Sequence, residues 1–289
     1  MNKNYLIFGR IGLLVLSQTA IAHTTIKEGS IEGTTLYTAD VINHGCVSGT
    51  NPKIPVIAES VVFPNGSDSV ATVLSNSGDA EQPIDINSVI EGGALTIIPT
   101  GIQDKNVFNV HTVQTDSLGN VRGFQYLSNS SSNTRAFNYS IPTLTIPPGP
   151  QSVTGLPASS ATTNNAAPQG QEGELQLDLV GVIPFKLAGV SFQASSCATQ
   201  LNIRIGIVDW CTQGTDDQRN DIWIGHTTSV FNETDRIATG TLGYWPTLTI
   251  TRDLAKNPLP ESCGGGQIVA VEPSDDAIDT YLPMSGFTP

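Results

Sequence analysis

Short runs of apolar or alternating apolar and polar residues recur along the chain, and none grows into a sustained helical period. The clearest run, residues 201–210, alternates Leu, Ile, Ile and Ile with mostly polar or small residues. Turn residues separate the runs, which is typical of short strands. The pattern predicts an all-β protein of the β-sandwich class, with strands at residues 54–63, 70–74, 94–98, 107–113, 137–146, 174–182, 185–193, 201–210, 246–250 and 268–271.

The balance of charged residues limits the classes of partner that the protein is expected to bind. The 289 residues include 13 Lys and Arg against 26 Asp and Glu, for a formal net charge of −13. Nucleic acids and anionic lipids need clustered basic residues, so neither is an expected partner. An acidic chain suits an extracytoplasmic protein or one that handles cations.

The first 22 residues have the features of a secretory signal peptide. Lys3 and Arg10 form a basic start, residues 11–16 a short apolar stretch, and residues 20–22 (Ala-Ile-Ala) a small-residue cleavage site. No later segment is apolar enough to span a membrane. The sequence therefore predicts a periplasmic, secreted or cell-surface protein whose mature chain is residues 23–289.

Cys46, Cys197, Cys211 and Cys263 predict two disulfides in an oxidising compartment. Cys197 and Cys211 flank the predicted strand 201–210, which spans about 33 Å, so they should not bond to each other. We expect Cys46–Cys197 with Cys211–Cys263, and Cys46–Cys211 with Cys197–Cys263 stays open. The spacings contain no CxxC pair, which argues against a zinc ribbon.

Residues 147–173 are rich in Pro, Gly, Ser and Asn and predict a long flexible loop. The loop could separate two domains or interrupt one. The expected disulfides join Cys46 to a cysteine beyond the loop, so we predict a single sandwich domain over residues 23–289 with loop insertions.

Cleavage after Ala22 would make His23 the first residue of the mature chain. Its α-amine and its imidazole can chelate one metal ion, and two nitrogen donors suit Cu(II). The amine titrates near pH 7.7–8.0, so a metal can displace its proton near neutral pH.

The region 23–66 resembles the YcnI-type family of secreted copper-binding proteins. The resemblance rests on His23 after the signal peptide, on His44-Gly45-Cys46, on Ile54 and Val56, and on residues 63–66 (Phe-Pro-Asn-Gly). Residues 192–197 (FQASSC) are similar to a late strand of that family, whereas residues 67–173 and 212–289 do not align. The resemblance implies an immunoglobulin- or fibronectin-like sandwich that binds Cu(II) through His23 and a carboxylate, with a Trp nearby.

No aligned motif identifies the carboxylate or the other ligands. The candidate carboxylates are Glu28, Glu172, Glu174 and Asp209, of which we prefer Glu174 and Asp209. Trp210, next to Asp209 in sequence, is the expected aromatic neighbour. His111 is a further candidate ligand because it lies on the more polar face of a predicted strand. The acidic residues 272–279 lack the calcium-loop pattern and predict a solvated surface.

The leading hypothesis is therefore a non-enzymatic copper(II)-binding protein for copper homeostasis. Its partner would be a copper transporter or chaperone. A structural or adhesive surface sandwich without metal is the first alternative. The second is a copper oxidase or monooxygenase with an N-terminal His, which would need His111 or His226 to complete a three-nitrogen site.

Overall fold

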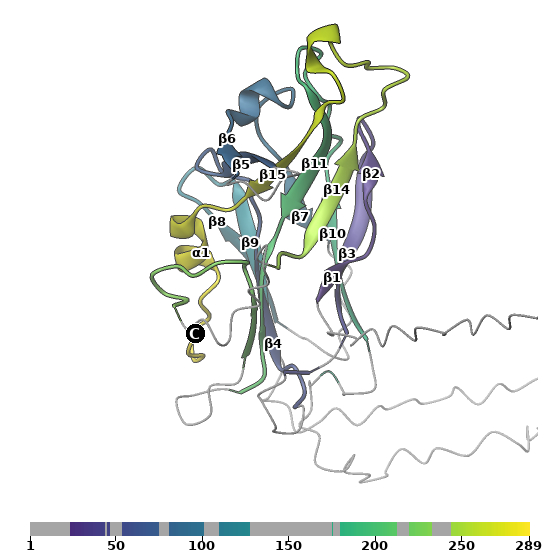
Figure 1. Ribbon diagram of the computed structural model, residues 1–289. Helices are drawn as coiled ribbons and strands as arrows, with labels where there is room; N and C mark the ends of the chain where they lie inside the picture. The colour runs from purple at the N-terminus through teal and green to yellow at the C-terminus, as the bar shows by residue number, and fades with distance from the viewer. Residues whose placement is uncertain are drawn as a thin grey trace, which may run out of the picture.

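The computed structural model describes residues 24–43, 45–46, 54–74, 81–100, 110–127, 175, 180–212, 220–232 and 244–289. Figure 1 shows an elongated arrangement of short strands, with the helix α1 (Asp275–Tyr281) on one side. The predicted all-β, sandwich-like class is confirmed. No feature of the described chain assigns it specifically to the immunoglobulin or fibronectin type.

The strands form three sheets. The four-stranded sheet has the order β1 (Thr25–Ile26), β3 (Leu36–Ile42), β10 (Gly181–Leu187) and β7 (Ile97–Pro99). The six-stranded sheet has the order β2 (Ser30–Ile31), β14 (Thr247–Thr251), β11 (Ala198–Arg204), β15 (Gln267–Glu272), β5 (Val70–Leu74) and β6 (Gln82–Pro83). The five-stranded sheet has the order β13 (Asn220–Trp223), β12 (Gly206–Trp210), β4 (Ala58–Val62), β9 (Val121–Leu127) and β8 (Val110–Thr115).

The run 201–210, predicted as one strand, is shared between two sheets. β11 pairs with β14 and β15 in the six-stranded sheet, and β12 pairs with β4 and β13 in the five-stranded sheet. Between them, the Ile205 amide donates to the Pro246 carbonyl at 2.9 Å. The alternation of apolar side chains continues through the junction, so the sequence pattern does not reveal the change of sheet.

Each sheet combines segments from before and after residues 147–173. β3 pairs with β10, β4 pairs with β12, and β5 pairs with β15. Strands on either side of that segment therefore depend on one another for their hydrogen bonds. The predicted strand 137–146 and the loop 147–173 lie outside the described residues.

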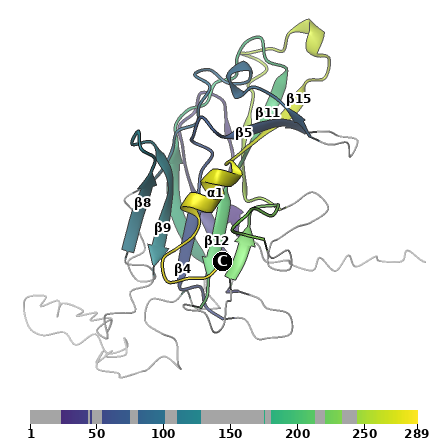
Figure 2. The same ribbon diagram turned by 90° about the vertical axis from the view of Figure 1, so that its left-hand side faces the viewer.

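Two hydrophobic cores flank the five-stranded sheet. The main core includes Phe63, Phe124 and Phe185. The ring centroid of Phe63 lies 5.6 Å from that of Phe124 and 5.4 Å from that of Phe185. The second core lies on the opposite face, where residues of β4, β12 and β13 cluster with Ala277 and Ile278 of α1. Figure 2 shows α1 close to β4 and β12. Burial of these apolar faces is the dominant favourable term in folding.

The helix α1 was not predicted, because seven residues are too few to show a helical period. Ser274 caps it by accepting a hydrogen bond from the Ala277 amide at 3.2 Å. The predicted solvated acidic surface is only partly confirmed. Asp275 and Asp276 are exposed, whereas Asp279 is half-buried and accepts hydrogen bonds from Thr228 and Ser229. Two 3₁₀ turns, Ile86–Ser88 and Glu261–Cys263, complete the described elements.

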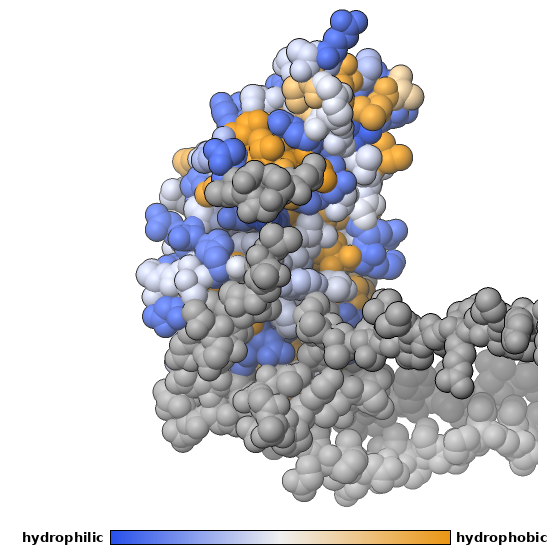
Figure 3. All heavy atoms as spheres, viewed as in Figure 1, coloured by the Kyte–Doolittle hydropathy of each residue, from blue (hydrophilic) through white to orange (hydrophobic). Residues whose placement is uncertain are grey.

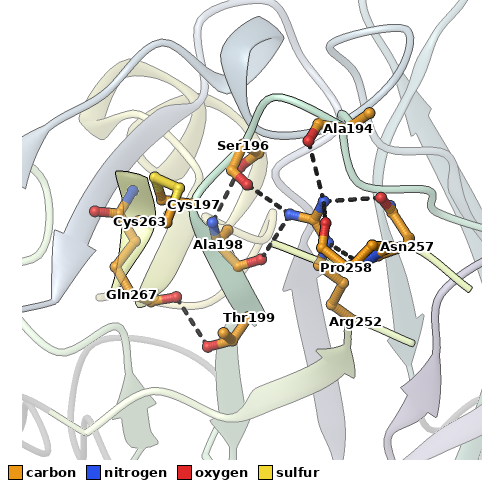
Figure 4. The surroundings of a disulfide bond; sticks show 10 residues. All are labelled: Ala194, Ser196, Cys197, Ala198, Thr199, Arg252, Asn257, Pro258, Cys263 and Gln267. Carbon is orange, nitrogen blue, oxygen red and sulfur yellow. Dashed lines mark hydrogen bonds between the residues drawn. A yellow bond between two sulfur atoms is a disulfide. The ribbon is translucent and has the colours of Figure 1, made fainter. Parts of the chain in front are cut away.

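The disulfides are Cys46–Cys211 and Cys197–Cys263. The first-choice pairing, Cys46–Cys197 with Cys211–Cys263, is wrong, and the alternative that the spacing left open is correct. Cys197 and Cys211 do lie at opposite ends of the β11–β12 run, as predicted. Figure 4 shows the Cys197–Cys263 bond beside Arg252, whose buried guanidinium donates to backbone carbonyls of residues 194, 196, 198, 257 and 258.

The surface seen in Figure 3 is largely hydrophilic, with hydrophobic patches interspersed. None of the described helices has the length and apolarity needed to cross a membrane. Two disulfides are typical of proteins that mature in an oxidising, extracytoplasmic compartment.

Candidate functional site: a buried acid cluster

Three buried acidic side chains lie close together: Asp40, Glu59 and Asp209. We call them the acid cluster. Asp40 comes from β3, in line with the inward-facing Thr38 and Ile42. Glu59 on β4 and Asp209 on β12 stand directly opposite each other in the antiparallel register. Like charges at such a position destabilise a sheet, so this pairing needs a physical compensation.

All three side chains are almost completely removed from solvent. Their exposed fractions are 0% for Asp40, 0% for Glu59 and 3% for Asp209. Burial raises the pKa of Asp40 to about 6, although hydrogen bonds from neighbouring groups lower it in part. Burial also raises the pKa values of Glu59 and Asp209 well above their usual range, and the negative charge of Asp40 adds to both effects.

The acid cluster has fewer hydrogen bonds than buried carboxyl groups normally have. Asp40 Oδ1 accepts from the Thr24 hydroxyl at 2.8 Å, and Asp209 Oδ2 accepts from the Trp223 indole at 2.9 Å. Asp40 Oδ2, Asp209 Oδ1 and both carboxyl oxygens of Glu59 have no donor among the described residues. A proton on Glu59 would let it donate to Asp40, which is why their contact lowers the pKa of Asp40 and raises that of Glu59.

Aromatic side chains surround the carboxyl groups. Tyr126 of β9 stands opposite Glu59, and burial together with the Glu59 charge raises its pKa. Tyr244 packs edge-on against Trp223 at 5.6 Å, and burial near Asp40 raises its pKa to about 12. Both phenols therefore stay neutral near neutral pH, and neither changes the net charge of the cluster.

Within the described ranges, every Lys and Arg is engaged away from the acid cluster. Lys27, Arg122, Arg204 and Lys256 pair with other carboxylates, Lys186 lies over Tyr37, and Arg252 binds carbonyls. Buried charges are normally paired or neutralised. The described part of the chain thus leaves the acid cluster without a compensating positive charge.

The start of the described chain is anchored at this cluster. Thr24 is buried at 2% exposure, its hydroxyl binds Asp40, and its carbonyl accepts from the Tyr244 hydroxyl at 2.9 Å. The next residues form β1, which pairs with β3 so that Ile26 stands opposite Asp40. Residue 23 is therefore attached directly to a residue that contacts the acid cluster.

The structure brings one predicted ligand into this site. Asp209 belongs to the acid cluster, whereas Glu28 lies at the surface beside Lys27. The predicted ligands His23 and Glu174, with Glu172, lie outside the described residues. His111 stands opposite Tyr126 in the β8–β9 register, so its backbone is two strands from Glu59, and its role as a ligand stays a prediction.

The indole beside Asp209 is Trp223 and not the expected Trp210. Successive residues of a strand point to opposite faces, so Trp210 faces the second core, where its indole donates to Ser60 Oγ at 3.0 Å. Trp223 faces the main core and donates to Asp209. The prediction of Trp210 was based on its adjacency to Asp209 in sequence, but adjacent residues of a strand lie on opposite faces.

His226 is placed elsewhere. Its ring packs edge-on against Trp245 of the second core at 5.4 Å, and its Nε2 lies 2.9 Å from Asp275 Oδ1. The second core and the acid cluster lie on opposite faces of the five-stranded sheet. The described geometry therefore gives no support to His226 as a partner of His23.

Sequence reasoning missed Asp40, Glu59 and Trp223. The signal that could have found them is an acidic residue inside an otherwise apolar strand, as in Ala39-Asp40-Val41 and Ala58-Glu59-Ser60. Such residues are rarely buried without a functional or structural reason.

The residues present offer part of a metal site. Among the described residues, no group of three His, Cys, Asp or Glu side chains is arranged to hold a metal ion by itself. Four carboxyl oxygens of the acid cluster have no hydrogen-bond donor among the described residues. His23, which precedes Thr24 in sequence, lies outside the described residues.

Comparison of the chain with protein-family models, with curated proteins and with solved structures finds no match.

Proposed function

We propose that this protein binds Cu(II) outside the cytoplasm, at a site formed by the mature N-terminus and the acid cluster. The amine and imidazole of His23 would supply two nitrogen donors, and Asp40 would supply the carboxylate oxygen. Glu59 and Asp209 would balance the charge of the ion. Copper bound in this way would be held for import, storage or delivery, with no reaction catalysed.

The observation that carries the proposal is the contact between Thr24 and Asp40. It places the residue after His23 against a buried carboxyl group that pairs with none of the described Lys and Arg side chains. The predicted signal cleavage, the two disulfides and the resemblance of residues 23–66 to copper-binding proteins support the same function. Nitrogen and carboxylate donors together suit the tetragonal coordination that Cu(II) prefers.

A competition titration against a coloured chelator tests the proposal. The mature protein should bind one Cu(II) tightly, and a form that retains Ala22 should lose this site because an amide replaces the terminal amine. Asp40→Asn should weaken binding markedly. Asp209→Asn is the matched control with a smaller effect, because Trp223 already occupies one of its oxygens. Equal binding by the mature and Ala22-retaining forms would overturn the proposal.

A further inference from the structure

We propose that the edge strand β8 pairs with the β8 strand of a second copy of this chain, so that two five-stranded sheets join into one continuous sheet across a two-fold axis. The proposal concerns the edge of the sheet and not the acid cluster. It is independent of Cu(II) binding.

β8 forms an open edge of the five-stranded sheet. β9 pairs with it on one side, and no described strand pairs with it on the other. Figure 2 shows β8 at the outer margin of the sheet. The unpaired N–H and C=O groups along such an edge are a template for pairing with another strand.

The other sheet edges formed by the described strands are protected from such pairing. β1, β2 and β6 have only two residues each. β7 has three residues and contains Pro99, and β13 has four residues and contains Asp221. β8 has six residues, Val-His-Thr-Val-Gln-Thr, with no Pro, Asp, Glu, Lys or Arg. Short length, proline and charge are the means by which proteins prevent edge pairing, so β8 is the described edge that remains able to pair.

The apolar face of the main core reaches this edge and is still exposed there. Val113 of β8 stands opposite Phe124, which is fully buried in the main core. Val113 itself is 42% exposed. A strand added alongside β8 would cover Val113, so pairing would bury apolar surface as well as satisfy backbone groups.

The composition of β8 fits a second copy of the same chain. The protein has a formal net charge of −13, which opposes self-association over most of its surface. Two β8 strands would bring no Asp, Glu, Lys or Arg together, and Asp116, which follows β8, already lies 3.9 Å from Arg122. Antiparallel pairing of identical strands is two-fold symmetric and uses both free edges, so assembly stops at a dimer.

Sedimentation equilibrium of the purified protein in EDTA, from low micromolar to sub-millimolar concentration, tests the proposal. The protein should show a reversible equilibrium between monomer and dimer. Hydrogen exchange should show slower exchange of the backbone amides of residues 110–115 at the higher concentrations, because the paired edge is then protected.

Two lysine substitutions test the edge itself. Thr112 and Val113 are exposed on opposite faces of β8. Thr112→Lys and Val113→Lys should each raise the dissociation constant of the dimer by about 10-fold or more, because like charges then approach across the axis. Val182→Lys is the matched control, since Val182 is 50% exposed on β10, an inner strand of the four-stranded sheet. It should leave the dissociation constant unchanged.

Circular dichroism and thermal unfolding check that each variant is folded. A protein that stays monomeric at every concentration would overturn the proposal. So would a dimer that both β8 variants leave intact, or one that Val182→Lys weakens as strongly as they do.

Discussion

The Thr24 hydroxyl donates a hydrogen bond to Asp40 Oδ1 at 2.8 Å, and both side chains are buried. This bond joins the start of the described chain to the acid cluster. Thr24→Val keeps the shape of the side chain but leaves Asp40 without this donor. We expect it to lower stability by about 1–3 kcal/mol and Cu(II) affinity by roughly 10-fold to 100-fold.

Thr24→Ser is the matched control for this prediction, because it keeps the hydroxyl group. It should retain most of the Cu(II) affinity in the same chelator competition. If Thr24→Val bound copper as tightly as the unaltered protein, Thr24 would not position the metal site.

The contact between Trp223 and Asp209 predicts which tryptophan reports copper. Cu(II) quenches nearby indole fluorescence, and Trp223 lies on the same side of the sheet as the acid cluster, whereas Trp210 lies in the second core. Trp223→Phe should remove most of the quenching that titration with Cu(II) produces. Trp210→Phe should leave the absolute decrease in fluorescence nearly unchanged, and the reverse outcome would place the metal on the other face of the sheet.

The two disulfides should differ in their effect on the site. Cys46–Cys211 joins residues 165 positions apart. It links the segment that follows β3, the strand of Asp40, to the segment that follows β12, the strand of Asp209. Its replacement by two serines should cost about 5 kcal/mol of stability and weaken Cu(II) binding.

Cys197–Cys263 closes 66 residues in the six-stranded sheet and serves as the control. Its replacement should cost about 4 kcal/mol and leave Cu(II) affinity near its original value. Denaturant unfolding and chelator competition on both double variants check these values. Equal loss of copper binding in the two variants would show that the effect is general destabilisation.

The raised pKa values of the acid cluster predict a pH dependence of stability in the metal-free protein. Folding raises the pKa of Asp40 from 3.8 to about 6 and raises those of Glu59 and Asp209 as well. The folded state therefore binds more protons than the unfolded state above pH 4, so stability falls as pH rises through 6 and beyond.

For Asp40 alone the loss amounts to about 3 kcal/mol, since one pKa unit is about 1.4 kcal/mol. Urea unfolding in EDTA between pH 4 and 8 measures this slope. Glu59→Gln should flatten it, because it removes the Glu59 carboxyl group, whose own pKa burial raises well above its usual value. A slope of the opposite sign in the unaltered protein would contradict the description of the cluster.

The all-β class was predictable because its signal is local. Residues 70–74 were predicted as a strand with the bounds that β5 has, and residues 246–250 and 268–271 fall within one residue of β14 and β15. The site was less predictable because it depends on which strands become neighbours. The opposition of Glu59 and Asp209 follows from the pairing of β4 with β12, 150 residues apart in sequence, which no local pattern encodes.

The prediction of the disulfide pairing was wrong for the same reason: it depends on which strands become neighbours. Spacing alone excluded Cys197–Cys211 but could not choose between the two remaining pairings. The choice depends on β11 and β15 running in parallel, which brings Cys197 next to Cys263. Asp209, by contrast, was named as a candidate from sequence, although for its neighbour Trp210 rather than for Trp223.

Electron paramagnetic resonance of the mature protein loaded with one equivalent of Cu(II) shows whether His23 binds the ion. We predict hyperfine coupling to two nitrogens, and replacement of ¹⁴N by ¹⁵N in His23 alone should change both couplings. A form that retains Ala22 should lose this spectrum. Spectra that are identical for the two forms, or couplings unaffected by the His23 label, would contradict a copper site built on the mature N-terminus and the acid cluster.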